Sequence, residues 1–240
     1  MNIQDFKETD EEKTKRLKKI KHLFDIRITI AKEGREAFLK KEYVLAASKY
    51  HQYLGIYADY NEVENIFKIT TSMFDSQKQM REMFLISQVY WDLVKINHLT
   101  PKLSENYQKA LNQFVAFTIN QPYQVLNAET LRKYINKSKI KNPSGIEAMQ
   151  EAHRQIYVQS KKCYIATYLL NEEHPVVTKL RIFKKNLGEF KLGISFIRLY
   201  YQVSPKIILH SQKNQITGLF LAGVVKPILY FLSFFIKGEK

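Results

Sequence analysis

The residues best suited to chemistry are a single cysteine and a histidine that follows it. Cys163, the only cysteine of the chain, precedes Glu173 and His174. A thiolate activated by a histidine, which a carboxylate in turn orients, is a well-known nucleophile, so these three residues form the best catalytic constellation. A lone cysteine beside Tyr164-Ile165-Ala166 is far more typical of a small buried side chain. We therefore expect no catalytic residues and no enzymatic activity.

Other motifs that carry chemistry are absent from the sequence. It contains no GxxxxGK[ST], GxGxxG, HExxH or GxSxG pattern. Its 6 histidines are scattered, without the spacing of metal ligands. The sequence therefore predicts no metal site and no cofactor.

Positive charge is the strongest compositional signal. The net charge is +15, from 38 Lys and Arg against 23 Asp and Glu. Such an excess attracts polyanions: nucleic acid, an anionic lipid surface or an acidic partner. The densest acid-free cluster comprises Arg132, Lys133, Lys137, Lys139 and Lys141. We interpret it as a candidate polyanion-binding patch; the alternative is a solvated helix end before the breaker Asn142–Gly145.

Helices must position these residues, because turn-forming residues are scarce. The chain has 8 Gly and 6 Pro, whereas average usage is about 7 % and 5 %. Sandwiches and barrels need many tight turns, so the scarcity favours an all-α fold. The single cysteine suits a reducing compartment, and the charged N-terminus lacks the apolar core of a secretion signal.

The N-terminal half has aromatic residues at helical spacing around small ones. Gly34 is followed by Tyr43, Ala46, Tyr50 and Tyr53, a pattern that resembles a tetratricopeptide (TPR) repeat. A second set has the same spacing: Tyr107, Ala110, Phe114 and Phe117. The small residue lets two antiparallel helices approach closely, and the aromatic side chains fill the groove beside it. An irregular helical bundle is the alternative interpretation.

Between the two sets, residues Gln77–Ile96 predict an amphipathic helix that carries Trp91. The resemblance to TPR repeats implies a groove that binds a protein partner, with Tyr43, Tyr50, Tyr53 and Trp91 as the contact residues. A tryptophan on an apolar helix face is more commonly part of the core.

A series of short motifs fills the segment from about residue 163 to 208. They are Cys163-Tyr164-Ile165-Ala166-Thr167, Glu173-His174-Pro175, Leu180-Arg181, Phe183-Lys184, Leu192-Gly193, Phe196, Arg198, Tyr200-Tyr201 and Ser204-Pro205. In this order they resemble the CFI-box C-terminal domain, a module at the ends of otherwise unrelated bacterial proteins. The resemblance implies location and architecture and no particular chemistry. The spacing predicts helices over Pro175–Leu187 and Leu192–Val203, the second ended by Ser204-Pro205.

The tail, Ile216–Ile236, has 21 residues and a single charge, Lys226, followed by Pro227. About 20 apolar residues suffice to cross a bilayer, but a lysine at its centre costs about 2.5–3.5 kcal/mol. Small and polar residues recur along one stripe, which favours a helix lying in the membrane interface. We expect membrane contact through Phe220, Lys226, Pro227, Phe231 and Phe235. A spanning helix and a buried core helix stay open as alternatives.

Together these patterns predict an all-α protein built as an irregular or TPR-like antiparallel helical array. The expected parts are a TPR-like domain (residues 1–145), a basic CFI-box-like helical hairpin (146–213) and a hydrophobic tail (214–240). The predicted function is a non-enzymatic adaptor that binds a protein partner and an anionic membrane surface. It would be cytoplasmic, peripheral or tail-anchored at the inner membrane. Nucleic-acid binding is the alternative function.

Overall fold

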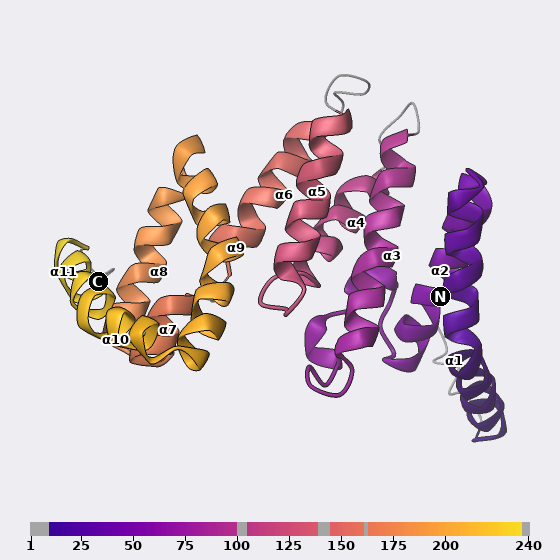
Figure 1. Cartoon of the computed structure of the whole chain (residues 1–240). Helices are drawn as coiled ribbons and strands as arrows, with labels where there is room; N and C mark the ends of the chain where they lie inside the picture. Colours follow the sequence, from indigo (N-terminus) through magenta and orange to yellow (C-terminus); the bar gives the residue numbers. More distant parts are fainter. Residues whose placement is uncertain (1–9, 100–104, 139–144, 161–162, 237–240) are drawn as a thin grey trace, which may run out of the picture. The chain divides into compact units, whose positions relative to one another are not determined.

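The computed structural model describes residues 10–99, 105–138, 145–160 and 163–236 (Figure 1). Every regular element in these ranges is a helix, and none of these residues lies in a strand. The prediction of an all-α fold is therefore confirmed. Residues 142–144 of the breaker, and the basic residues Lys139 and Lys141, lie outside the described residues. Gly145 is described and precedes α6 in the left-handed region, at φ 75°.

The chain divides into two compact units, residues 1–117 (unit 1) and 118–240 (unit 2). The boundary expected at residue 145 thus falls inside unit 2. The physical reason is that the helices on either side of it, α5 (Gln124–Ser138) and α6 (Ile146–Val158), pack against each other as a pair. The tail, expected as a separate segment, also packs on unit 2.

Unit 1 consists of two helical pairs. Its described elements are α1 (Asp10–Leu39), α2 (Tyr43–Tyr60), η1 (Ile66–Lys68), η2 (Thr71–Met73), α3 (Met80–Leu99) and α4 (Glu105–Ala116). Helices α1 and α2 lie side by side, as do α3 and α4, and α2 packs on α3 (Figure 1). The turn between α1 and α2 contains Lys41 in the left-handed region, at φ 66°.

The close approach of α1 and α2 depends on Gly34. A Cβ atom added to this residue would lie 2.8 Å from the nearest ring carbon of Tyr50. Tyr50 is itself buried and cannot turn outward. The prediction that a small residue opens this helix contact for an aromatic side chain is therefore confirmed.

Aromatic side chains fill the rest of the unit 1 core. The second predicted set, Tyr107, Ala110, Phe114 and Phe117, is buried throughout. Phe114 packs on Trp91 with ring centroids 5.1 Å apart and the rings tilted by 32°, and this aromatic contact helps to hold α4 on α3. This packing is consistent with a TPR-like pair, and the TPR likeness itself stays a prediction.

Unit 2 is a second helical array that ends in the tail. Its described elements are α5, α6, α7 (Tyr164–Leu170), α8 (Pro175–Leu187), α9 (Lys191–Lys213), α10 (Gln215–Phe220), the π-helical turn η3 (Leu221–Val225) and α11 (Lys226–Phe235). Helix α6 packs on α9, α7 on α8 and α9, and α11 on α7 and α8 (Figure 1).

Helix α8 has the predicted bounds, whereas the predicted end of α9 is wrong. His174 caps α8 by accepting a hydrogen bond from the Val176 N–H, and Pro175 occupies the first turn. Helix α9, in contrast, continues through Pro205 to Lys213. A proline inside a helix costs about 3 kcal/mol. Buried side chains on both sides of it, Tyr201 and Ser211, show the packing that offsets this cost.

Candidate functional site

The tail helix, Gln215–Phe235, presents a large apolar surface to solvent. It is the one helix among the described residues that is long and apolar enough to cross a membrane, and only 11 % of its most apolar window is buried. Its exposed large side chains are Ile216, Leu219, Phe220, Val224, Ile228, Tyr230, Phe231, Leu232, Phe234 and Phe235. Soluble proteins rarely expose such a continuous apolar patch without a partner for it.

The opposite side of the tail helix is fixed to unit 2. Leu221 and Ser233 are buried, and Leu229 packs against the apolar cluster of α7 and α8. Two polar contacts add to this packing: Lys179 Nζ donates to the Ser233 carbonyl oxygen at 3.3 Å, and Tyr230 Oη lies 3.2 Å from His174 Nε2. The tail therefore lies on its own unit by one narrow face and exposes the rest.

A π-helical turn and a proline lie in the middle of this helix. Residues Leu221–Val225 form the turn, and Pro227 follows at the start of α11. Proline has no backbone N–H to donate, and a π-bulge is a common way to absorb such a gap. The helix thus continues past Pro227, with Lys226 half-buried at the junction.

The five residues predicted to meet a membrane all lie on or beside the exposed side of the tail. Phe220, Phe231 and Phe235 are 56 %, 66 % and 72 % exposed. Pro227 is exposed and Lys226 is half-buried. Unit 2 adds a second apolar stripe on α9, which the sequence analysis did not single out: Leu192, Phe196, Leu199 and Val203. Their spacing of three and four residues places them on one face of that helix.

The predicted polyanion-binding patch is only partly described. Lys133 and Lys137 are exposed on α5. Arg132 instead donates to the Glu129 carboxylate at 2.8 Å, so part of its charge is compensated within the helix. Of the five predicted residues, the structure therefore shows Lys133 and Lys137 exposed on the surface of α5.

A more polar groove lies between α5, α6 and α9. Arg132, His153, Arg154, Lys191 and Arg198 line it. Among the described residues no hydrogen-bond partner contacts His153 Nε2 or Arg198 Nε, although both atoms are buried. Burial lowers the pKa of His153 to about 4, so the ring is neutral near pH 7. Glu147 also lines the groove, and Arg132 and Arg154 pair with Glu129 and Glu151, so the positive charge of the groove is partly offset.

Three of the four residues predicted to bind a partner lie in the core of unit 1. Tyr50, Tyr53 and Trp91 are 1 %, 0 % and 2 % exposed, and Tyr43 is half-buried. These three side chains therefore stabilise the unit and do not line an exposed groove. The apolar, helical spacing that placed them in a groove applies equally to a core position.

One buried carboxylate, Asp92, and one half-buried carboxylate, Glu82, join the helices around these aromatic residues. Asp92, next to Trp91, accepts hydrogen bonds from Tyr50 Oη at 2.6 Å and from Arg35 Nη1 at 2.9 Å, and pairs with Lys95 Nζ at 2.5 Å. Glu82 similarly receives two hydrogen bonds from Arg27 at 3.1 Å. Both carboxylates are thus held by cations, as buried charges must be, and serve a structural role.

The residues of the candidate catalytic constellation do not act together. Both ring nitrogens of His174 are occupied, Nδ1 by the Val176 N–H and Nε2 by the Tyr230 hydroxyl. Cys163 contacts a different residue: the Tyr200 hydroxyl lies 4.0 Å from its sulfur. Burial raises the pKa of the Cys163 thiol, which disfavours the thiolate. Glu173 is exposed.

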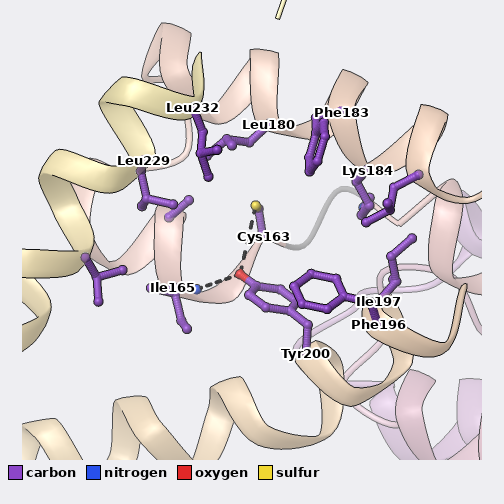
Figure 2. Close-up of a pocket in the computed structure, with 13 residues that line it drawn as sticks. Cys163, Ile165, Leu180, Phe183, Lys184, Phe196, Ile197, Tyr200, Leu229 and Leu232 are labelled. Atoms are coloured by element: carbon purple, nitrogen blue, oxygen red, sulfur yellow. Dashed lines mark hydrogen bonds between the residues drawn. The ribbon is translucent and has the colours of Figure 1, made fainter. Parts of the chain in front are cut away.

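Cys163 instead lines an apolar pocket beneath the tail helix (Figure 2). The volume of this tail pocket is about 230 Å³, and helices α7, α8 and α9 form three of its sides. The tail closes the fourth side with Val225, Leu229 and Leu232. The remaining lining residues are Ile165, Ala166, Leu180, Phe183, Lys184, Leu187, Phe196, Ile197 and Tyr200.

Tyr200 orders one wall of the tail pocket. Its hydroxyl accepts a hydrogen bond from the Ile165 N–H at 3.0 Å, which satisfies a free donor in the first turn of α7 (Figure 2). The same hydroxyl donates toward the sulfur of Cys163. The polar atoms on this side are therefore paired with one another, and the pocket surface consists of carbon and sulfur.

Among the residues that the structure describes, Lys184 is the one cationic side chain that lines this pocket. Its Nζ donates to the Ser160 carbonyl oxygen and to Tyr201 Oη, the latter at 3.1 Å. Both partners are neutral, and no carboxylate of the described residues pairs with Lys184. Burial lowers the pKa of Lys184 from 10.5 to about 8. Nothing in the local sequence around Lys184 indicated that this residue is buried.

Comparisons with known proteins identify no relative. No protein-family model, no curated protein and no solved structure matches the chain. The resemblance of residues 163–208 to the CFI-box domain therefore stays a prediction. Within the described residues, no cluster of His, Cys, Asp and Glu could hold a metal ion.

Proposed function

We propose that this protein is a non-enzymatic helical adaptor that binds an anionic membrane surface through the tail helix of unit 2. The observation that carries the proposal is the apolar surface of Gln215–Phe235, which its own unit leaves largely uncovered. The membrane interface is an environment that can cover such a surface. The CFI-box resemblance, which implies a module at a chain end, is compatible with this placement.

The attachment of the tail to unit 2 favours a helix that lies in the plane of the membrane. Spanning would break the contacts of Leu229, Ser233 and Tyr230 with α7 and α8. It would also place Lys226 near the bilayer centre, at a cost of about 2.5–3.5 kcal/mol. In-plane binding preserves these contacts and needs only the exposed side to enter the interface.

Apolar transfer supplies enough free energy for this binding. Burying one Phe, Leu or Ile side chain contributes about 1.5–3 kcal/mol. Three exposed phenylalanines of α11, Phe231, Phe234 and Phe235, would together contribute roughly 4 kcal/mol or more, about a thousand-fold in partitioning. The basic residues of unit 2 add attraction to anionic lipids, at about 1 kcal/mol per side chain near the surface.

Flotation with lipid vesicles tests the proposal. The wild-type protein should float with vesicles of phosphatidylcholine and phosphatidylglycerol. The variant Phe231→Ser/Phe234→Ser/Phe235→Ser should lose at least about 100-fold in partitioning. A matched control replaces three similarly exposed apolar residues of unit 1, Leu39, Val44 and Tyr60, by Ser. Equal recovery of all three proteins with the vesicles, or with the soluble fraction, would refute the proposal.

Binding of a protein partner by unit 1 belongs to the same proposal. The exposed residues Leu45 and Tyr60 on α2 are available for such contacts, whereas Tyr50, Tyr53 and Trp91 are not. Nucleic-acid binding through Lys133 and Lys137 is the alternative function. It predicts an affinity for oligonucleotides that falls steeply as salt rises, and an affinity insensitive to salt would exclude it.

A further inference from the structure

The tail pocket has space that unit 2 does not fill. Its volume of about 230 Å³ exceeds the roughly 150 Å³ of an engineered apolar cavity that stays dry and binds benzene. Phe183 and Phe196 line the pocket yet are 40 % and 61 % exposed, so they mark an opening to solvent. A ligand can therefore enter without unfolding of the unit.

The lining selects for hydrocarbon. Apart from Lys184 and the paired hydroxyl of Tyr200, the pocket is formed by aliphatic and aromatic carbon and by the Cys163 sulfur (Figure 2). A polar ligand would lose its hydration there without gaining hydrogen bonds, which disfavours its binding. A saturated chain loses nothing on entry, and the part that exceeds the pocket can lie along Phe196 on α9.

Lys184 indicates the charge of the ligand. Lys184 lines the pocket, and among the described residues its buried Nζ donates to two neutral groups, the Ser160 carbonyl and the Tyr201 hydroxyl. A buried ammonium without a counter-ion is unfavourable. An anionic group at this end of the pocket would supply the missing charge and form a charge-assisted hydrogen bond.

We propose that the tail pocket binds one fatty acid, with its alkyl chain between α7, α8, α9 and the tail and its carboxylate at Lys184. This inference goes beyond membrane binding by the tail and does not depend on it. The pocket uses the inner side of the tail, through Val225 and Leu229, whereas membrane contact uses the outer side.

Equilibrium dialysis of the full-length protein with radiolabelled laurate, below the critical micelle concentration of laurate, tests whether the tail pocket binds an alkyl chain. Wild-type protein should bind about one laurate. Val225→Phe, which fills the pocket from the tail, should weaken binding at least ten-fold. Val224→Phe adds the same ring at the neighbouring residue, which is exposed and does not line the pocket, and should bind like wild type. Equal binding by both variants, or no binding by wild type, would overturn the proposal.

Comparison of laurate with dodecanol tests the role of Lys184. In wild type, laurate should bind at least ten-fold more tightly than dodecanol. In Lys184→Met, which keeps the apolar stem and removes the charge, the two ligands should bind alike. A preference for laurate that survives in this variant would contradict the carboxylate position. This comparison of the two ligands also tests the proposal if the Val225→Phe variant fails to fold.

Vesicle flotation of Val225→Phe separates this inference from the proposed function. The variant retains the exposed side of the tail, so it should float like wild type while losing laurate. If the wild-type protein floats with vesicles but binds no laurate, the proposal of fatty-acid binding alone is refuted. Laurate binding without flotation would refute the membrane proposal alone.

Discussion

Lys184 is the residue at which burial and charge conflict most directly in unit 2. Its side chain is 7 % exposed, and burial lowers its pKa to about 8. In the unfolded chain the pKa returns to its ordinary 10.5. Between these values the unfolded state binds more protons than the folded state, so the stability of unit 2 rises with pH. The gain amounts to about 3 kcal/mol.

Lys184→Met should abolish this rise. Calorimetric unfolding between pH 7.5 and 9.5 is expected to show the wild-type midpoint increasing relative to that of the variant as pH rises. The variant should also be as stable as wild type or more so at pH 7.5, because an apolar isostere of a buried charge avoids its desolvation. Parallel pH curves for the two proteins would contradict the buried position of this ammonium.

His153 gives the corresponding prediction in acid. Burial lowers its pKa from 6.5 to about 4, so between these values the unfolded state takes up a proton that the folded state does not. Stability is therefore lost as pH falls from about 6.5 toward 4. His153→Gln should show a smaller loss than wild type in thermal unfolding over this range. An equal loss in both proteins would show that the folded ring is protonated as readily as a free histidine.

For single residues, the sequence predicts which side chains lie on a packed helix face better than it predicts what those side chains do. The spacing of Tyr50, Tyr53 and Trp91 correctly placed them on helix faces that pack. It could not decide between a groove and a core, because both require aromatic residues three or four apart. The burial of Lys184 and the Tyr200 hydrogen bonds depend on contacts between helices distant in sequence, and no local pattern reports them.

Among the elements, the contact between α1 and α2 offers the sharpest test of the packing. Gly34→Ala places a methyl group 2.8 Å from the buried ring of Tyr50. Overpacking costs about 1–3 kcal/mol, and the better helix propensity of alanine returns at most about 1 kcal/mol. The melting temperature of unit 1 should therefore fall.

Gly55→Ala is the matched control within α2. Nothing lies within 4 Å of a Cβ added there. The propensity gain of up to about 1 kcal/mol should then appear alone, as a raised melting temperature. Stabilisation by both substitutions would mean that α1 and α2 are further apart than the structure has them.

Element boundaries followed the sequence where local signals were strong. His174-Pro175 marked the start of α8 because a capping side chain and a proline at the first turn are local features. Ser204-Pro205 failed as a stop signal because tertiary packing keeps α9 helical through it. The tail was recognised from its length and composition, whereas the identity of its packed face, Leu221, Leu229 and Ser233, depends on α7 and α8.

For the whole molecule, the attachment of the tail to unit 2 changes how truncation should be interpreted. Removing residues 214–240 uncovers the apolar cluster that includes Cys163, Val177 and Leu180. The truncated protein should show a lower unfolding midpoint for unit 2 and an unchanged midpoint for unit 1, measured by calorimetry. Equal midpoints for unit 2 with and without the tail would show that the tail does not pack on it.

The domain organisation was the least predictable property. A breaker in the sequence marks a turn, but it does not reveal whether the helices on either side belong together. Helices α5 and α6 do pair across the expected boundary at 145. Composition alone did predict the all-α class, because scarce Gly and Pro disfavour turn-rich folds. This argument does not depend on which helices pack together.

Quenching by brominated phospholipids measures directly whether the tail helix contacts lipid. Bromine on the acyl chains quenches a tryptophan only at close range. Phe234→Trp places the probe at a residue that is 90 % exposed on α11, and Val44→Trp places it at a residue that is 89 % exposed in unit 1. Trp91, the only native tryptophan, is common to both proteins. We predict strong quenching for the tail probe and none beyond the wild-type background for the unit 1 probe; equal quenching of the two, or none of either, would contradict the account.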